Sequence, residues 1–279
     1  MTTKGNPGVV YVADPKLLAC SNAVPILKHR ATLVHHLISA YGLQSKMKVV
    51  PSAPATEEEV RGFHSEEYVK FLQVAQPDDQ EIIEDEFGLG FDCPVINNLW
   101  TIVCQVAGAS LTAARALTTC QAKIAINWCG GWHHAQRDCA AGFCYVNDIV
   151  LAVRHLRTKF DKILYVDLDI HHGDGVENAF FFSPKVVTMS FHQLEAGFFP
   201  GTGKCKDTGQ GGYNKVNTAK LWTTITSEIL NIPISAEIPE HQFFPLYGPS
   251  FELEVTAGLR KSENTQKSLD ETIQEVHGK

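Results

Sequence analysis

Short apolar runs alternate with longer segments of helical periodicity along most of this 279-residue chain. Such alternation is typical of a parallel sheet whose two faces are covered by helices. The sequence therefore predicts an α/β fold, with one domain built around a central, mostly parallel sheet. We expect strands at 8–13, 123–127, 163–166 and 186–190, and helices at 23–40, after the N-caps Thr56 and Ser65, at 97–122 and at 147–158.

Composition narrows the classes of function. The formal net charge of −7 and the isoelectric point near 5.9 argue against direct binding of nucleic acid and suit a basic partner such as a lysine-rich tail. The first twenty residues do not resemble a secretory signal, and no apolar stretch is long enough for a membrane helix. We therefore expect a soluble intracellular protein whose eight scattered cysteines are free thiols.

The most informative local pattern follows the apolar strand that ends near Val166. There the chain reads Asp-Leu-Asp-Ile-His-His-Gly-Asp-Gly, from Asp167 to Gly175. In an extended chain Asp167, Asp169 and His171 project to the same side. Two carboxylates and an imidazole suit zinc or another divalent transition metal, which would offset the cost of burying them. A solvent-exposed acidic loop that caps the next helix is the alternative, but it needs fewer acids and no paired histidines.

Two further loops are expected at the same edge of the sheet, beyond the carboxyl ends of the strands. In the first, His133 and His134 follow two glycines and are candidates for proton transfer near neutral pH. The pair His35-His36, by contrast, lies inside an expected helix and is interpreted as structural. In the second loop, Phe198-Phe199 either lines a slot for an aliphatic chain or belongs to the core.

Taken together, these motifs resemble the class I histone deacetylases, most nearly their short, number-eight subtype. The resemblance runs from about Pro25 to Gly209 and from Gly212 to about Val255. It implies the arginase/deacetylase-like α/β fold and hydrolysis of the acetyl amide on lysine side chains. The motifs that carry it are WHHA, GFCYVND, YVDLDIHHGDG and GFFPGTG.

The resemblance also implies individual roles. Asp169 and His171 match zinc ligands, and His134 matches the general base, with His133 as its tandem partner. Asp167 and Asp174 look like the carboxylates that orient these histidines, and Tyr213 looks like the phenol that polarises the acetyl carbonyl. A potassium site is implied at Asp167, Asp169, Ser190 and the backbone near His171 and Phe191. The implied substrate contacts are Asp92, Gly142, Phe143, Phe199 and Tyr213, with Arg30 near an internal acetate channel.

Between Gly209 and Gly212 the family has a long segment that this chain lacks. It carries further strands and helices and the aspartate that completes the zinc site, so that only two obvious ligands remain here. His192 or Asp207 would substitute only after a rearrangement. The sequence therefore leaves two classes of function open: a zinc-dependent lysine deacetylase, or a catalytically impaired relative that binds partners.

The resemblance sets the remaining expectations. The deacetylase domain spans 1–257, with the internal deletion near 209–212, and a charged C-terminal tail follows at 258–279. Expected partners are acetylated histone tails, other acetyl-lysine proteins and corepressor proteins, with no direct nucleic acid or membrane. The family implies a nuclear location, with a cytoplasmic fraction, and a role in transcriptional repression.

Overall fold

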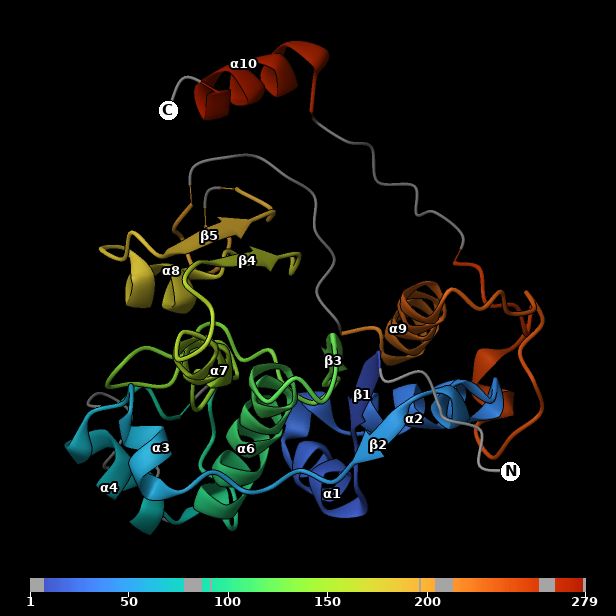
Figure 1. Ribbon diagram of the computed structural model, residues 1–279, viewed down its shortest axis with the longest axis horizontal. Coiled ribbons are helices and arrows are strands. Elements are labelled where there is room, and N and C mark those ends of the chain that lie inside the picture. Colours follow the sequence, from blue (N-terminus) through green and yellow to red (C-terminus); the bar gives the residue numbers. More distant parts are fainter. Residues whose placement is uncertain are drawn as a thin grey trace.

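The computed structural model describes residues 8–77, 87–90, 92–195, 197–203, 213–255 and 264–277. Helices and short strands alternate along it as the sequence predicts (Figure 1). The strands are β1 (Val9–Val12), β2 (Lys48–Val50), β3 (Ile124–Ile126), β4 (Ile163–Asp167) and β5 (Val186–Ser190). The α-helices are α1 (Pro15–Ala23), α2 (Arg30–Ala40), α3 (Glu57–Arg61), α4 (Glu66–Val74), α6 (Leu99–Thr118), α7 (Asp148–Leu156), α8 (Asp174–Phe180), α9 (Lys215–Leu230) and α10 (Gln266–His277).

Helix starts follow the expected capping chemistry, with one correction. Thr56 and Glu59 form the predicted capping box at α3, and Ser65 caps α4. The single helix expected at 23–40 is wrong, because α1 ends at Ala23 and α2 begins only at Arg30. Pro25 has no backbone N–H to continue α1 and restricts the residue before it, so the apolar spacing spans two helices.

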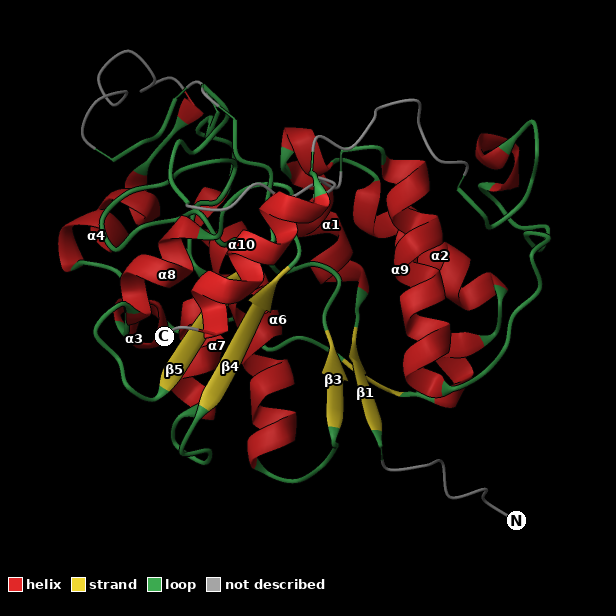
Figure 2. Cartoon of the chain, turned by 90° about the horizontal axis from the view of Figure 1, so that it is seen from above, coloured by secondary structure: helices red, strands yellow, loops and turns green. Residues whose placement is uncertain are grey.

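All pairings between strands are parallel, but the ladder is in two parts. One sheet has the order β2-β1-β3 and the other pairs β4 with β5. Figure 2 shows β3 and β4 running in the same direction with a space between them. A cavity of about 330 Å³ lies there, lined by side chains of β3 and β4 and by α6 and α7. The predicted parallel architecture is confirmed, and helices rather than strand pairing connect its two parts.

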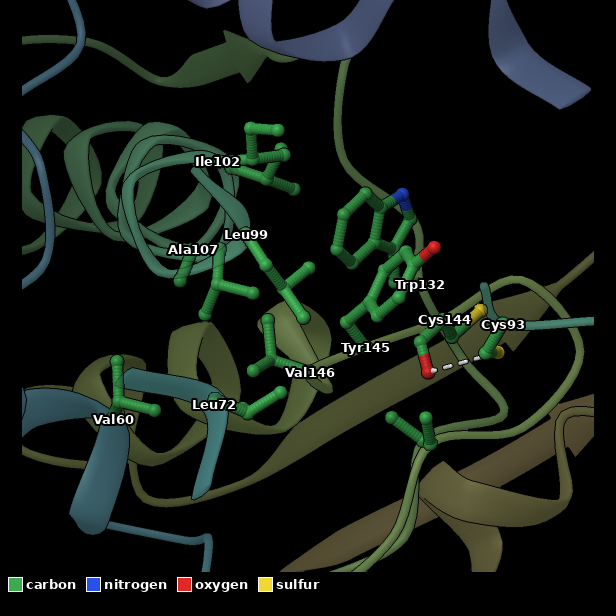
Figure 3. Close-up of a cluster of buried hydrophobic side chains, with 14 of the residues drawn as sticks. Val60, Leu72, Cys93, Leu99, Ile102, Ala107, Trp132, Cys144, Tyr145 and Val146 are labelled. Carbon is green, nitrogen blue, oxygen red and sulfur yellow. Dashed lines mark hydrogen bonds between the residues drawn. The ribbon is translucent and has the colours of Figure 1, made fainter. Parts of the chain in front are cut away.

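The largest core cluster lies between α4, α6 and the loop after β3 (Figure 3). Leu99 and Ile102 of α6 lie on the side of that helix that faces Trp132 and Tyr145 (Figure 3), and Val106 belongs to the same cluster. The helix approaches the chain at 53–55 so closely that a Cβ at Gly108 would meet the carbonyl oxygen of Ala53. Trp132, in the loop that carries the paired histidines, belongs to this cluster, so the core holds that loop against α6.

The two sheets differ in how well their faces are covered. Val10, Tyr11 and Val12 in β1 are completely buried, as expected for a strand between layers of helices. In the β4–β5 sheet every second residue is exposed, so only one face is packed. The open face carries Leu164, Val166, Val187 and Met189, which are 61%, 44%, 58% and 41% exposed.

Two further observations concern the described cysteines and helices. The seven cysteines among the described residues are free. Within the described ranges, no helix combines the length and apolar character needed to cross a membrane. The acidic stretch at 76–86 and the start of the tail at 258–263 lie mostly outside the described residues, while 266–277 forms α10.

His64 makes the fold sensitive to acid. It is buried, its Nδ1 lies 3.2 Å from the carbonyl oxygen of Arg137, and its Nε2 accepts the N–H of Asn147 at 3.0 Å. Burial lowers the pKa of His64 to about 4, against 6.5 for an ordinary histidine. Since the unfolded chain takes up the proton first, stability is complete above pH 6.5 and is lost as the pH falls toward 4.

We predict that the free energy of unfolding falls by roughly 1 to 3 kcal/mol for this group between pH 6.5 and 4. Urea titrations at several pH values measure it. Glutamine has no charge to gain, so His64→Gln should remove the contribution of His64 to the pH dependence of the unfolding free energy. His29→Asn, at an exposed position, should leave that dependence unchanged. The same slope in the wild type and His64→Gln would contradict the assignment.

Candidate functional site

The loops that follow β3 and β4 meet at one edge, as parallel strands require. The first loop carries His133 and His134, whose rings lie 3.9 Å apart between centroids. Asp167 ends β4, and Asp174 begins α8. The structure therefore brings the predicted histidines and their carboxylates together, although no hydrogen bond joins the two strands that deliver them.

Two buried residues at the start of α7 fix the first loop. The carboxylate of Asp148 accepts the N–H groups of Gly131 and Trp132 at 3.1 and 2.7 Å, and the Ser110 hydroxyl donates to it. Asn147 caps α7 and donates its amide to the carbonyls on either side of His134, those of His133 and Ala135. Sequence reasoning quoted both residues within a motif but assigned them no role; an Asn-Asp pair at a helix start was the available signal.

His133 and Asp167 form a buried pair. His133 Nδ1 lies 2.6 Å from Asp167 Oδ2, and Tyr165 donates its hydroxyl to the same oxygen. Burial opposes a charge on His133, but the hydrogen bond and negative charge of Asp167 outweigh it and raise the pKa of His133. Burial also opposes ionisation of Asp167, and the hydrogen bond from His133 lowers its pKa despite that. The pair therefore favours a charged imidazole beside a carboxylate.

His134 and Asp174 form a second pair with the opposite tendency. His134 Nδ1 lies 2.7 Å from Asp174 Oδ1, and Gln136 holds the other carboxylate oxygen at 3.1 Å. Burial lowers the pKa of His134, and the positive charge of His133 adds to this, while Asp174 acts against it. The two adjacent imidazoles are thus driven apart in pKa, which is the pattern expected of an acid and a base that share a site.

Asp169 and His171 lie beside these pairs. Asp169 Oδ1 is 2.9 Å from His171 Nδ1 and 3.9 Å from His133 Nε2. Oxygen and nitrogen donors suit zinc, but a catalytic zinc ion usually takes three protein ligands. Within the described ranges, no group of three or more acidic, histidine or cysteine side chains is arranged to hold a metal ion. The described donors, Asp169 and His171, are therefore of a kind that binds zinc, but they are fewer than the three ligands that a catalytic zinc ion usually takes.

Of the two candidate substitutes for the third ligand, only His192 lies among the described residues, and it contacts other groups. His192 Nδ1 contacts the Ser190 hydroxyl at 2.9 Å, and its ring packs on His172 rather than on Asp169. Asp207 lies outside the described residues, as does the junction at 209–212. The potassium site implied for Asp167, Asp169 and Ser190 stays a prediction.

Aromatic rings surround the paired donors. Phe199 packs edge-on against His134 at 4.9 Å, and Phe198 stacks on His171 at 5.1 Å. Tyr213 lies 6.0 Å from His171 and 6.2 Å from Phe143, measured between ring centroids. Both rings contact histidines of the site, and Phe199 is 43% exposed rather than part of the core; the slot for an aliphatic chain stays a prediction.

Gly142 lets the opposite wall approach the histidines. A Cβ at this residue would lie 2.5 Å from His134 Cδ2 and 2.9 Å from Phe199, and its φ of +52° favours glycine. Its N–H donates to Asp92 Oδ2 at 2.9 Å. Asp92 and Phe143 also line an adjoining cavity of about 340 Å³. Of the residues expected to contact substrate, Asp92 and Phe143 thus line this cavity, and Gly142 and Phe199 lie against His134.

Tyr213 and Arg30 reach the site from α9 and α2. Tyr213 directly precedes Asn214, which caps α9, and burial raises the pKa of Tyr213 to about 12, so the phenol keeps its proton at neutral pH. Arg30 lies over the ring of Trp222 in α9 at 5.2 Å. Trp222 in turn stacks on Trp128, just after β3, at 4.7 Å. These contacts dock α9 beside the paired histidines.

Comparison with known proteins decides the family. The model of the histone deacetylase domain matches residues 24–248. The chain belongs to the histone deacetylase family. It is 35% identical to histone deacetylase 8 of Danio rerio, over 97% of this chain and 94% of that protein, and 36% identical to that of Xenopus tropicalis, over 96% of each. Identity to histone deacetylase HDAC1 of Drosophila melanogaster is 31%, over 88% of this chain and 64% of that protein.

These matches confirm the class I resemblance and its nearness to the number-eight subtype. By resemblance the chain is a zinc-dependent deacetylase, a hydrolase, with the fold of this family. The alignment with the Danio rerio deacetylase spans 356 positions, more than the 279 residues of this chain. That relative therefore has residues with no counterpart here, which agrees with an internal deletion without locating it.

We predict that Asp148→Asn lowers the free energy of unfolding by about 1 to 3 kcal/mol. An amide in place of the carboxylate turns one acceptor into a donor, so the N–H of Gly131 or the buried N–H of Trp132 loses its acceptor. Chemical unfolding followed by circular dichroism measures the change. Asp138→Asn, at an exposed position, is the matched control and should have little effect; equal stability of both variants would refute the role of Asp148.

Proposed function

We propose that this chain binds acetylated lysine side chains of histones and other proteins and hydrolyses the acetyl amide. The observation that carries the proposal is the pair of imidazoles, each held by its own carboxylate, beside Asp169, His171 and a phenol. General acid–base catalysis of amide hydrolysis needs one group to take a proton and another to return one. Adjacent histidines with divergent pKa values meet that need.

The residues divide the work according to their hydrogen bonds. Nδ1 of His134 is hydrogen-bonded to Asp174. Nε2 is therefore the ring nitrogen that would take a proton from the attacking water. His133, whose pKa is raised, is suited to carry the proton that it would return to the nitrogen of the leaving lysine amine. The protonated phenol of Tyr213 would donate a hydrogen bond to the oxyanion.

A divalent metal enters only through the donors present. Asp169 and His171 would hold zinc, or another divalent transition metal, as two of its ligands. When bound, zinc acidifies a water molecule and polarises a carbonyl group. Catalytic zinc usually takes three protein ligands, and the described residues supply two. We therefore expect this site to bind the metal less tightly than a site with three ligands.

The substrate class follows from the walls and the charge. Phe143 and Phe199 flank the site and would enclose the aliphatic part of an acyl-lysine, with Asp92 at the outer cavity. A net charge of −7 favours basic tails. The acidic charge and the membership of the histone deacetylase family support histone tails as substrates. The family alone supports a nuclear location with a cytoplasmic fraction, corepressor proteins as partners and a role in transcriptional repression.

The incomplete donor set favours a second candidate. In it, the chain binds acetyl-lysine proteins without turnover, as a catalytically impaired deacetylase that competes for partners. The walls and the histidine pairs would be retained, and only the metal-dependent step would be lost. The two candidates therefore differ in metal content and turnover rather than in recognition.

Zinc content and turnover of the purified chain separate the two candidates. For the deacetylase we expect close to one zinc ion per chain by mass spectrometry and measurable hydrolysis of an acetyl-lysine peptide. Asp169→Ala should remove both, whereas His134→Ala should lower turnover at least ~100-fold and leave zinc bound. Peptide binding without zinc or hydrolysis would support the impaired relative, and turnover that survives both substitutions would belong to a contaminant.

Tyr213→Phe tests the oxyanion role separately. It removes only the hydroxyl, so we expect kcat to fall by about 10²–10³-fold with nearly unchanged zinc content. Steady-state kinetics and metal analysis on the same preparation measure both. Tyr247→Phe, a buried tyrosine packed near His241, serves as the matched control. Parallel loss of zinc and kcat in Tyr213→Phe would contradict a role on the oxyanion.

A further inference from the structure

The β4–β5 sheet exposes a continuous aliphatic face. Leu164 is paired in register with Val187, and Val166 with Met189, so the four exposed side chains form two adjacent rows. On the other side of the sheet, β5 packs against α8, and α7 lies on that side in Figure 1. A parallel sheet is normally covered on both sides, because both of its faces are apolar. The open face therefore calls for a cover.

The C-terminal helix α10 has a matching apolar stripe. Leu269 and Ile273, one helical turn apart, lie on the same side of the helix and are exposed. Lys267 and Glu271 form an ion pair on the opposite side of the helix. This helix lies beyond residues 24–248, which match the model of the deacetylase domain.

The position of α10 relates it to this face. Figure 1 shows α10 on the side of β4 and β5 that is away from α7, and Figure 2 shows it crossing in front of the two strands. Within the described ranges, α10 is not among the elements that pack extensively against another. Residues 256–263 connect it to the rest of the chain, and eight residues can span up to about 29 Å.

We propose that α10 docks on the aliphatic face of the β4–β5 sheet and is its cover within the same chain. Leu269 and Ile273 pack on Leu164, Val166 and their partners in β5. The connection through 256–263 holds the helix at high local concentration, which favours it over an untethered competitor. A second copy is a poorer occupant, since four aliphatic side chains fall well short of the roughly 800 Å² per partner that stable dimers bury.

Photo-crosslinking of the full chain tests where α10 lies. With p-benzoylphenylalanine in place of Ile273, we expect crosslinks within one chain to residues 163–168 and 186–190, mapped by mass spectrometry. The same probe in place of Glu271, on the opposite side of the helix, should give few of them. Covalent dimers, or crosslinks that map to other elements, would overturn the proposal.

Hydrogen exchange tests what the contact does. The double variant Leu269→Lys, Ile273→Lys should increase amide exchange in β4 and β5 by at least ~3-fold, because the sheet then opens more readily. The matched control Lys267→Ala, Glu271→Ala changes only the polar side of α10 and should leave exchange unaltered. Both variants alter exposed residues outside the matched domain, so the fold is retained. Equal exchange in the two variants would refute the contact.

Discussion

The packing of α6 against α7 is the constraint on which the site depends. The paired histidines lie in the loop after β3, and their acidic partners lie at the end of β4 and the start of α8. The strands β3 and β4 are nevertheless not paired with each other. Helices α6 and α7 pack extensively on each other and line the cavity between the two strands. Ser110 in α6 and Asp148 in α7 also meet at the loop after β3. The helical layer therefore sets the spacing that a continuous sheet would otherwise provide.

Buried charge is tolerated at the site because it is shared in pairs. Asp167 lies against His133, whose raised pKa favours the charged imidazole, whereas Asp174 contacts His134, whose pKa is lowered, through a hydrogen bond. An unpaired carboxylate at this depth would lose its hydration without compensation. Among the described residues, Asp169 is hydrogen-bonded to the ring of His171, while His133 Nε2 lies farther away, at 3.9 Å. The local charges are thus balanced for proton transfer, while the donor set for a metal is left short.

Much of this arrangement could be predicted from the sequence, and the failures have physical causes. Alternation of side chains placed Asp167, Asp169 and His171 after a strand, and parallel topology brought them to His133 and His134. Apolar spacing alone did not detect the break between α1 and α2, because the side chains on both sides of Pro25 are buried. The supporting roles of Asn147 and Asp148 depend on long-range hydrogen bonds to loop backbone, which residue spacing does not encode.

The stack of Trp128 on Trp222 ties α9, and with it Tyr213, to the loop after β3. Trp222 lies in α9, Arg30 covers its ring, and Tyr213 stands at the start of the same helix. If α9 detached, the phenol and the guanidinium contact would be withdrawn together, while the imidazole–carboxylate pairs remained assembled on the other elements. Indole fluorescence would register that separation directly, as a spectroscopic signal of a half-assembled site.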